Sequence, residues 1–441
     1  MKRLLLVVCV LMMGACAKDD VKLVSNIWDG SIAQSFAGGK GTATTPYLIE
    51  TGAQLVLMKQ YPSSYFMLVQ NIDLNNKAWP SFDFSGTLDG NGFVISNLKV
   101  TKNGNNLGLF AILEGMVKSL TISGVTIESS GNNVGAIAGQ LYNGSITNCT
   151  IQLNKDSFIS GNDYVGGVVG LAHDDFLTVT KCTVNGVSTA NQIIGNEYVG
   201  GIIGYLRSVS TPTPMEDCSV SANIAGSEIV GGLIGYSSIS GDIGDDGYYI
   251  KRCSFTGKLS AKSAVAGIIG ECSGNTTIAG CKADVEITVE DNYAAGIATS
   301  SSTIFGTSII GSYALGKINS SKGSANAIGG LVATYKGVNS TIDNCYSMIV
   351  CNSTNFSGLC GCDGAGSHWN CYYSGIINCA SIMSEVHSVD NCTSTGNNFS
   401  EFLQSCYSAY ASYWDFEECW IWKGNVNGQD RSVICPLLAW E

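Results

Sequence analysis

The sequence predicts an all-β fold, a right-handed parallel β-helix (solenoid) with a short helical N-terminal cap and a mixed C-terminal cap. The main observation is a glycine-rich phrase, Val165-Gly-Gly-Val-Val-Gly170 in its clearest form, that recurs about every 31 residues, and a fixed period of this size indicates one unit stacked on itself. A cysteine follows each copy at a similar distance, except after the sixth, where Ser312 takes its place. The copies begin at Val134, Val165, Val199, Val230, Val265, Ala294, Ile328 and Phe356, and the cysteines are Cys149, Cys182, Cys218, Cys253, Cys281, Cys345 and Cys371.

One unit, residues 163–197, is predicted to form three short strands joined by turns. Tyr164 to Leu171 and residues 189–194 give the first and third strands, and 177–184 gives the second because its side chains alternate in character. We expect this alternation to place Leu177, Val179, Lys181 and Thr183 on one face and Thr178, Thr180, Cys182 and Val184 on the other. Strand crossovers within one sheet are overwhelmingly right-handed, which predicts the hand of the solenoid.

Stacking in register predicts two internal columns, one of the phrase valines and one of the cysteines. At roughly 4.8 Å per coil the rod is roughly 45 Å long. Cysteine side chains that lie parallel in register fit the torsion of a disulfide poorly, so we expect the cysteine column to be reduced and inert. The irregular C-terminal cysteines, such as Cys379 and Cys406, could be bridged, but the sequence gives no connectivity.

The composition excludes several classes of protein. The chain has 441 residues, of which 45% are hydrophobic and 13% are charged, so a disordered chain is not expected. It has 23 basic and 35 acidic residues, with a net charge of −12 and no basic run. A nucleic-acid partner is therefore not expected, nor is electrostatic docking to anionic lipid.

The N-terminus predicts a targeting segment. Lys2 and Arg3 precede an apolar run that ends in Met13-Gly-Ala-Cys16. This pattern is typical of a bacterial lipoprotein signal peptide at residues 1–15, with Cys16 as the lipid attachment site and 16–27 as a lipidated tether. An ordinary signal peptide, cut near Ala15 or Ala17, is the alternative. Acyl chains such as palmitate would attach the protein to the membrane through this lipid only.

The two ends of the rod need caps, because exposed strand edges recruit further strands. Residues 28–80 are predicted to form the N-terminal capping segment, with a helix over 51–60 that begins at the N-cap Thr51 and an entering strand over 65–74. The parallel β-helix itself is expected over 81–378. Residues 379–441 are predicted to form the C-terminal cap, with a helix over 400–410 and four tryptophans that cover the last coil or serve as a carbohydrate platform: Trp414, Trp420, Trp422 and Trp440.

Two columns beside the phrase are candidate parts of a ligand-binding face. Two residues before each phrase lie Asp163, Glu197 and Glu228, which could hold Ca²⁺ or simply form a solvated ladder of turns. The next column has Tyr164 and Tyr198, which strand alternation predicts to point outward. Stacked rings there could dock sugars or a protein, or could only stabilise neighbouring coils.

A second candidate is the insertion at residues 240–249. Its carboxylates Asp242, Asp245 and Asp246 could hold Ca²⁺, with Lys251 or Arg252 as a base. That set would suit a polysaccharide lyase acting on acidic glycans, whereas an acidic turn is the plainer interpretation. A glycoside hydrolase based on paired carboxylates is a further alternative that no motif locates.

These motifs resemble the GLUG-repeat proteins of bacterial cell surfaces. The Gly-Leu-x-Gly signature stands as Gly232-Leu-Ile-Gly235 and Gly358-Leu-Cys-Gly361, and residues 38–49, 84–98 and 436–440 resemble the opening and closing segments of that group. The resemblance implies an adhesin-like surface lipoprotein of the Bacteroidetes type, in the outer membrane and exposed on the cell. Some relatives accompany secreted proteases, but this chain has no HExxH motif and only three histidines, so the resemblance implies no protease activity here.

Together these features predict a surface lipoprotein that presents a β-helical rod for adhesion or for binding glycan or protein. A host glycan or glycoprotein is the expected partner, the chain is expected to be a monomer, and no cofactor and no enzymatic activity are expected. Two alternatives stay open: an enzyme acting on acidic glycans, and a structural surface spacer without its own ligand.

Overall fold

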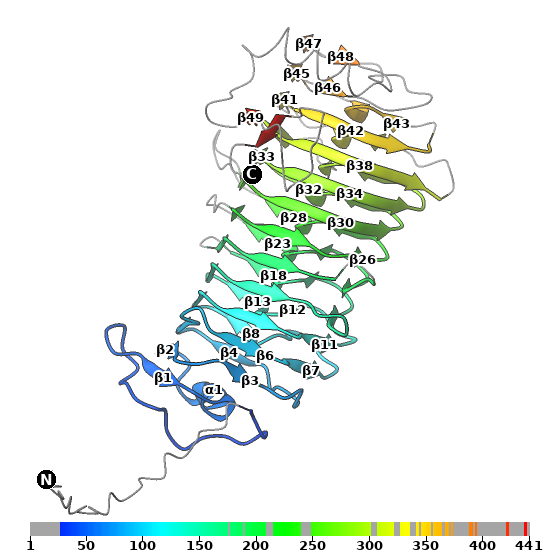
Figure 1. Ribbon diagram of the computed structural model, residues 1–441. Coiled ribbons are helices and arrows are strands. Elements are labelled where there is room, and N and C mark those ends of the chain that lie inside the picture. The colour runs from blue at the N-terminus through cyan, green and yellow to red at the C-terminus, as the bar shows by residue number, and fades with distance from the viewer. Residues whose placement is uncertain are drawn as a thin grey trace, which may run out of the picture.

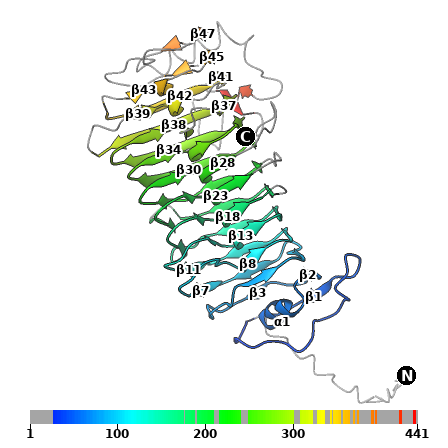
Figure 2. The same cartoon turned by 180° about the vertical axis from the view of Figure 1, so that it is seen from behind.

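The computed structural model shows a parallel β-solenoid whose coils stack from a capped N-terminal end (Figure 1). Seen from behind, the same coils form the walls of a single rod (Figure 2). The structure describes residues 27–174, 177–187, 190–208, 215–239, 248–300, 307–321, 327–335, 341–343, 345–353 and 356–363, and beyond them the short strands at 367–369, 372–373, 388–390, 393–394, 420–422 and 436–438. The predicted fold class is confirmed.

Four parallel sheets run along the described rod, and each coil contributes to them in turn. The residues at the start of each repeat phrase form an eight-stranded sheet: β12 (Val134–Gly135), β17 (Val165–Gly166), β22 (Val199–Gly200), β27 (Ile229–Gly231), β31 (Ala264–Ala266), β35 (Tyr293–Ala295), β39 (Ala327–Gly329) and β43 (Phe356–Ser357). The next segment of each coil forms a ten-stranded sheet: β4 (Phe82–Phe84), β8 (Phe110–Leu113), β13 (Ala138–Tyr142), β18 (Val169–His173), β23 (Ile203–Ser208), β28 (Ile234–Ile239), β32 (Ile269–Ser273), β36 (Ala298–Ser300), β40 (Val332–Tyr335) and β44 (Cys360–Asp363).

The other two sheets complete each coil. A thirteen-stranded sheet contains β1 (Tyr47–Ile49), β2 (Tyr65–Leu68), β5 (Thr87–Asp89), β9 (Met116–Lys118), β14 (Ser145–Thr147), β19 (Thr178–Thr180), β24 (Met215–Glu216), β29 (Tyr248–Lys251), β33 (Thr276–Ala279), β37 (Thr307–Ile310), β41 (Thr341–Asp343), β45 (Ser367–Trp369) and β47 (Ser388–Asp390). A seventeen-stranded sheet, which takes up to two strands per coil, contains β3 (Ile72–Asp73), β6 (Val94–Ser96), β7 (Lys99–Thr101), β10 (Thr121–Ser123), β11 (Thr126–Glu128), β15 (Thr150–Gln152), β16 (Phe158–Ser160), β20 (Thr183–Asn185), β21 (Ile193–Ile194), β25 (Ser219–Ser221), β26 (Ile224–Ala225), β30 (Ser254–Ala261), β34 (Lys282–Val289), β38 (Tyr313–Ser320), β42 (Tyr346–Cys351), β46 (Tyr372–Tyr373) and β48 (Thr393–Ser394).

The N-terminal cap contains the expected helix. It runs as α1 (Gly52–Leu57) and continues as the 3₁₀ turn η1 (Met58–Gln60), and the Thr51 side chain accepts a hydrogen bond from the Gln54 amide, as an N-cap does. The predicted entering strand over 65–74 is instead two strands, β2 and β3, that lie in different sheets. The chain turns a corner between them, at Val69 to Asn71.

At the other end, the described residues of the last segment give one antiparallel pair, β49 (Trp420–Trp422) with β50 (Pro436–Leu438). The predicted helix over 400–410 and the cysteines Cys379 and Cys406 lie outside the described residues.

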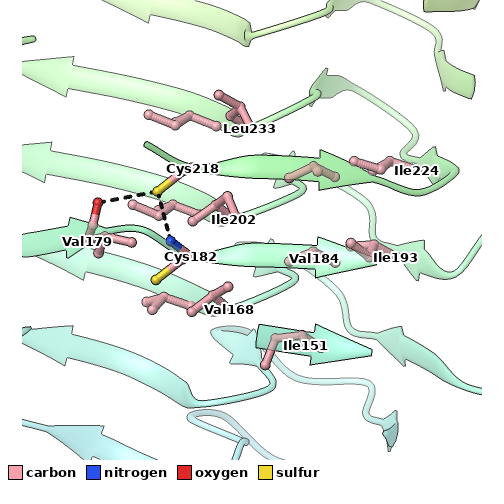
Figure 3. Close-up of a cluster of buried hydrophobic side chains, with 14 of the residues drawn as sticks. Ile151, Val168, Val179, Cys182, Val184, Ile193, Ile202, Cys218, Ile224 and Leu233 are labelled. Carbon is pink, nitrogen blue, oxygen red and sulfur yellow. Dashed lines mark hydrogen bonds between the residues drawn. The ribbon is translucent and has the colours of Figure 1, made fainter. Parts of the chain in front are cut away.

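The core consists of columns of like residues. The phrase valines pair in register from Val134 to Val265, and each is fully buried. The cysteines of successive coils form a second buried column of free thiols, part of which Figure 3 shows. The Cys182 amide donates to Cys218 Sγ at 3.5 Å, and the Cys218 amide donates to Cys253 Sγ at 3.4 Å.

The sixth coil preserves this column with a different residue. Ser312 accepts a hydrogen bond from the Cys281 amide at 3.0 Å, in the place that a cysteine sulfur takes in other coils. Cys345 lies beyond it and Cys371 falls outside the described residues. Burial raises the pKa of the Cys149 thiol to about 12, so very little reactive thiolate forms at neutral pH.

The prediction of one continuous strand over 177–184 was wrong. The chain forms β19 and β20 with a corner at Lys181, whose φ is 54°, in the left-handed region. This corner reverses the phase of the alternation, so that Val179, Cys182 and Val184 all face the core. The same corner recurs with positive φ at Ser119, Asn148, Asp217, Arg252, Gly280 and Gly311.

Candidate binding face

The outer surface of the ten-stranded sheet carries two columns of partly exposed side chains. In β13, β18, β23 and β28 the core-facing residues alternate with these outward residues. The strand register stacks one column as Gln140, Leu171, Tyr205 and Tyr236 and the other as Tyr142, His173, Arg207 and Ser238. Because neighbouring coils are only about 4.8 Å apart, each column places its side chains in contact.

Tyr164 and Tyr198 lie beside this sheet, in the turns that lead into β17 and β22. Both have a left-handed backbone, with φ of 58° and 53°, and both are half-buried. Their rings are parallel, with an interplanar angle of 1° and centroids 5.5 Å apart. The structure therefore brings together the two tyrosines that the sequence singled out. The direction of their side chains is set by the left-handed turn conformation and not by strand alternation.

Tyr205 and Tyr236 extend this pair into a cluster. The Tyr205 ring lies 5.3 Å from Tyr164 and 5.5 Å from Tyr198, and Tyr236 lies 4.8 Å from Tyr198. We call these four residues, which span successive coils, the tyrosine face. Sequence reasoning missed Tyr205 and Tyr236, yet each directly follows the last glycine of a repeat phrase, at Gly204 and Gly235, where alternation points a side chain outward.

A polar rim borders the tyrosine face. The Tyr142 and His173 rings lie 4.9 Å apart, and the His173 ring nitrogen Nε2 is hydrogen-bonded to the Gln140 amide. Burial is the main cause that lowers the pKa of His173, so its ring is neutral at pH 7. A hydrogen bond to Asp174 raises the pKa of Tyr142. The rim thus offers both donors and acceptors next to flat aromatic surface.

The hydroxyls of Tyr164, Tyr198 and Tyr236 are neutral at physiological pH. Burial is the main cause that raises the pKa of Tyr198, to about 12, and the nearby Glu197 carboxylate adds to it. Burial also raises the pKa of Tyr164 and Tyr236. Neutral phenols can both donate and accept hydrogen bonds, as sugar hydroxyls require.

Two carboxylates of the acidic column, those of Asp163 and Glu228, accept hydrogen bonds from residues in the turns around them. The Asp163 carboxylate accepts from the side-chain amides of Asn162 (3.0 Å) and Asn196 (3.1 Å), and Glu228 accepts from the Ser263 hydroxyl. Within the described part of the chain, no group of three or more His, Cys, Asp or Glu side chains is arranged to hold a metal ion. The carboxylates of Asp163 and Glu228 thus take part in hydrogen bonds of the turns beside the tyrosines.

Of the remaining candidate site residues, the structure describes only some. Cys16 and the three insertion carboxylates Asp242, Asp245 and Asp246 lie outside the described residues. Arg252, one of the two proposed bases, forms ion pairs with Asp217 at 2.6 Å and with Glu216 at 3.2 Å on the preceding coil. This pairing lowers the pKa of Asp217 and raises the pKa of Arg252, so the guanidinium stays charged and does not act as a base. Arg252 instead links its own corner to the preceding coil.

Comparisons with known proteins find partial similarities. No family model matches the chain. A putative Gly-rich membrane protein of Evansella cellulosilytica is 31% identical over 31% of this chain and 21% of its own length, and halomucin of Haloquadratum walsbyi is 33% identical over 32% of this chain and 2% of its own length. The chain thus spans about a fifth or less of these relatives.

Two solved structures are similar at a lower level. The crystal structure of a putative immunoglobulin A1 protease from Bacteroides ovatus has a TM-score of 0.40 and 18% identity, and covers 92% of this chain and 96% of its own. An IgA1 protease has a TM-score of 0.38 and 15% identity, and covers 80% of this chain and 24% of its own. Separately, no helix among the described residues is long and apolar enough to cross a bilayer.

Proposed function

We propose that this protein is a cell-surface lipoprotein of the GLUG-repeat type that binds glycans or glycoproteins through the tyrosine face. The observation that carries the proposal is the cluster of four half-exposed tyrosines on one lateral surface of a rigid rod. Aromatic rings offer a large apolar surface with a polar edge, which matches the apolar face and the hydroxyls of a sugar ring.

The rod supports this function by its rigidity. Each tyrosine is fixed by a strand or a tight turn and by its neighbouring rings, so little conformational freedom is lost when a ligand binds. Weak contacts on successive coils then add up along one ligand, or along several identical ligands on a surface. The polar rim of Gln140, Tyr142 and His173 supplies hydrogen bonds that orient the sugar.

Attachment to the outer membrane through a lipid on Cys16 completes the proposal. The signal-like segment at residues 1–15 supports a protein anchored by acyl chains. The name of the Evansella relative, a membrane protein, is compatible with such an address.

Glycan and glycoprotein arrays test this function. We expect a chain without residues 1–16 to bind a subset of glycans, and the double variant Tyr198→Ala/Tyr205→Ala to lose about tenfold or more in affinity, because each ring contributes about 0.5–1.5 kcal/mol. The matched control is Tyr65→Ala, which removes a tyrosine that is 40% exposed at the N-terminal end of the rod. Equal binding by the double variant and by the control would contradict the proposal, and binding to no glycan or glycoprotein would favour a structural spacer.

A further inference from the structure

A groove crosses the outer surface of the seventeen-stranded sheet, on a different sheet from the tyrosine face. It has a volume of about 620 Å³ and follows the rod axis from β26 across β30, β34 and β38 to β42. Its lining consists of Asn223, Thr256, Gly257, Lys258, Asp284, Val285, Glu286, Gly316, Lys317 and Val350.

The groove exists because the coil changes shape after β25 and β26. Those two short strands, which meet at a corner, both pair with the single eight-residue strand β30, and β34 and β38 keep this longer form. Gly257 and Gly316 lie in register with Val285 at the middle of the long strands. Both glycines line the groove beside Val285 and form part of its floor.

One wall of the groove is a row of alternating charges. Lys258, Glu286 and Lys317 lie directly above one another in the register. Glu286 Oε2 is 2.9 Å from Lys258 Nζ, and Glu286 Oε1 is 2.9 Å from Lys317 Nζ. The two lysines lower the pKa of Glu286, which keeps it charged.

This row leaves unused hydrogen-bonding capacity that faces outward. Each lysine ammonium has three donors, and the shared carboxylate takes one from each. The lysine side chains are 57% and 52% exposed, whereas Glu286 is 36% exposed. The two lysines lie two rungs apart along the backbone, about 10 Å, and their ammonium groups lie closer together than that because both contact the Glu286 carboxylate between them.

The opposite wall is polar and is not basic. Asp284 and Thr256 are paired in register and exposed, and Asn223 at the groove end accepts a hydrogen bond from the Lys258 amide. These side chains can accept or donate hydrogen bonds to hydroxyls across the groove. The apolar floor, the hydroxyl-binding wall and the spaced cations together suit the binding of a sugar polymer and not of a compact anion.

We infer that this groove binds a linear acidic polysaccharide that carries one anionic group on every second sugar. A pyranose unit in an extended chain advances by close to one rung of the solenoid, so anions on alternate sugars meet Lys258 and Lys317. The intervening neutral sugar places a hydroxyl or amide donor against Glu286. A polymer with an anion on every sugar would place a negative charge against the Glu286 carboxylate, which repels it.

Calorimetry on the chain without residues 1–16 tests this inference with three polymers. Hyaluronan has a carboxylate on alternate sugars, polygalacturonate has one on every sugar, and dextran has none. We expect hyaluronan to bind best, with an affinity that falls as salt is added. The double variant Lys258→Ala/Lys317→Ala should lose about tenfold or more in affinity for hyaluronan, because it removes both charge-assisted contacts.

The matched control is Lys155→Ala, which removes the same charge at an exposed position outside the groove. Circular dichroism confirms that each variant stays folded. Glu286→Gln separates recognition from structure, since it keeps the shape but removes the central charge. We expect it to bind polygalacturonate more tightly than the native chain does, so that the preference for hyaluronan shrinks.

The inference is overturned if hyaluronan does not bind, if the double lysine variant binds it as the Lys155→Ala control does, or if Glu286→Gln leaves the preference unchanged. Tyr198→Ala/Tyr205→Ala should leave hyaluronan binding intact, because the tyrosine face lies on another sheet. This comparison keeps the groove and the proposed function separable: each can fail while the other holds.

Discussion

Neighbouring coils approach closely at the position of the second glycine of the repeat phrase, which is glycine in every copy except the first, where it is Ala136. A Cβ atom on Gly201 would lie 2.2 Å from the carbonyl oxygen of Gly232, and one on Gly232 would lie 1.9 Å from that of Gly267. The obstructing atoms belong to the backbone of the next coil, which is held in a parallel ladder and cannot move aside. This glycine is therefore set by packing between coils.

The first glycine of the phrase is replaced by alanine in two coils, although a Cβ on Gly231 would lie 1.8 Å from the Ile234 carbonyl oxygen of its own coil. In the fifth and sixth coils Ala266 and Ala295 take its place in the register, and they pack together beside Tyr293. The weakening of the repeat toward the C-terminus thus preserves the glycine that separates coils while it relaxes the other.

Gly232→Ala tests this requirement. We expect it to lower the free energy of unfolding by about 1–3 kcal/mol, because overpacking against backbone forces the coils apart. Urea denaturation followed by circular dichroism measures the change, with Ser221→Ala on the exposed side of β25 as the control, expected within about 0.5 kcal/mol of the native chain. If the two variants are equally stable, the close approach at Gly232 is not real.

At this same scale, part of the candidate binding face could be predicted from the sequence. Tyr164 and Tyr198 were found because they precede consecutive phrases, and the columns of valine and cysteine followed from the period alone. Tyr205 and Tyr236 were missed because only the positions before each phrase were compared, and these two residues directly follow the phrase. Contacts between these columns depend on how two sheets meet at an edge, which a repeat period does not specify.

At the scale of the element, the left-handed corner between the thirteen- and seventeen-stranded sheets decides which side chains reach the core. The sequence suggested a single strand over 177–184 because the sign of φ at Lys181 leaves no trace in a pattern of apolar and polar residues. Different residue types occupy this corner, from Asn148 to Arg252 and Gly311, so no single residue marks it. The groove could not be predicted for a related reason. It depends on the replacement of two short strands, such as β25 and β26, by the single long strand β30 in the next coil.

Substitutions at Lys181 test the corner. Every L-residue in the left-handed region, Lys181 included, bears a cost of about 1–2 kcal/mol, and a β-branched residue bears a larger one. We expect Lys181→Val to lower the free energy of unfolding by about 1–2 kcal/mol, and Lys181→Gly, which copies the corner at Gly280, to leave it unchanged or raise it slightly. Thermal and urea unfolding measure both. A stable Lys181→Val variant would show that the corner is not left-handed in solution.

At the scale of the whole molecule, stability is the sum of contacts between neighbouring coils. Every described coil pairs mainly with the coil before it and the coil after it, so within the described rod stability is spread over many such contacts. The functional consequence is that a binding surface can lie on any side of the rod. The tyrosine face and the groove use two different sheets in overlapping parts of the stack.

Removal of one whole coil tests this architecture. Deletion of residues 165–198 joins Tyr164 directly to Val199, so β12 can pair with β22 as it now pairs with β17. We expect the shortened chain to keep a β-rich circular dichroism spectrum and a cooperative transition, with roughly 2 to 5 kcal/mol less stability in proportion to the residues lost. Tyr164 then takes the place of Tyr198 beside Tyr205, so glycan affinity should fall only by the loss of one ring and of the His173 contact in the polar rim. Deletion of residues 165–181 alone is the control: it leaves half a coil, puts the following strands into the wrong sheets, and should abolish the folded spectrum. If both deletions fold, or neither does, coils are not the independent units of this rod.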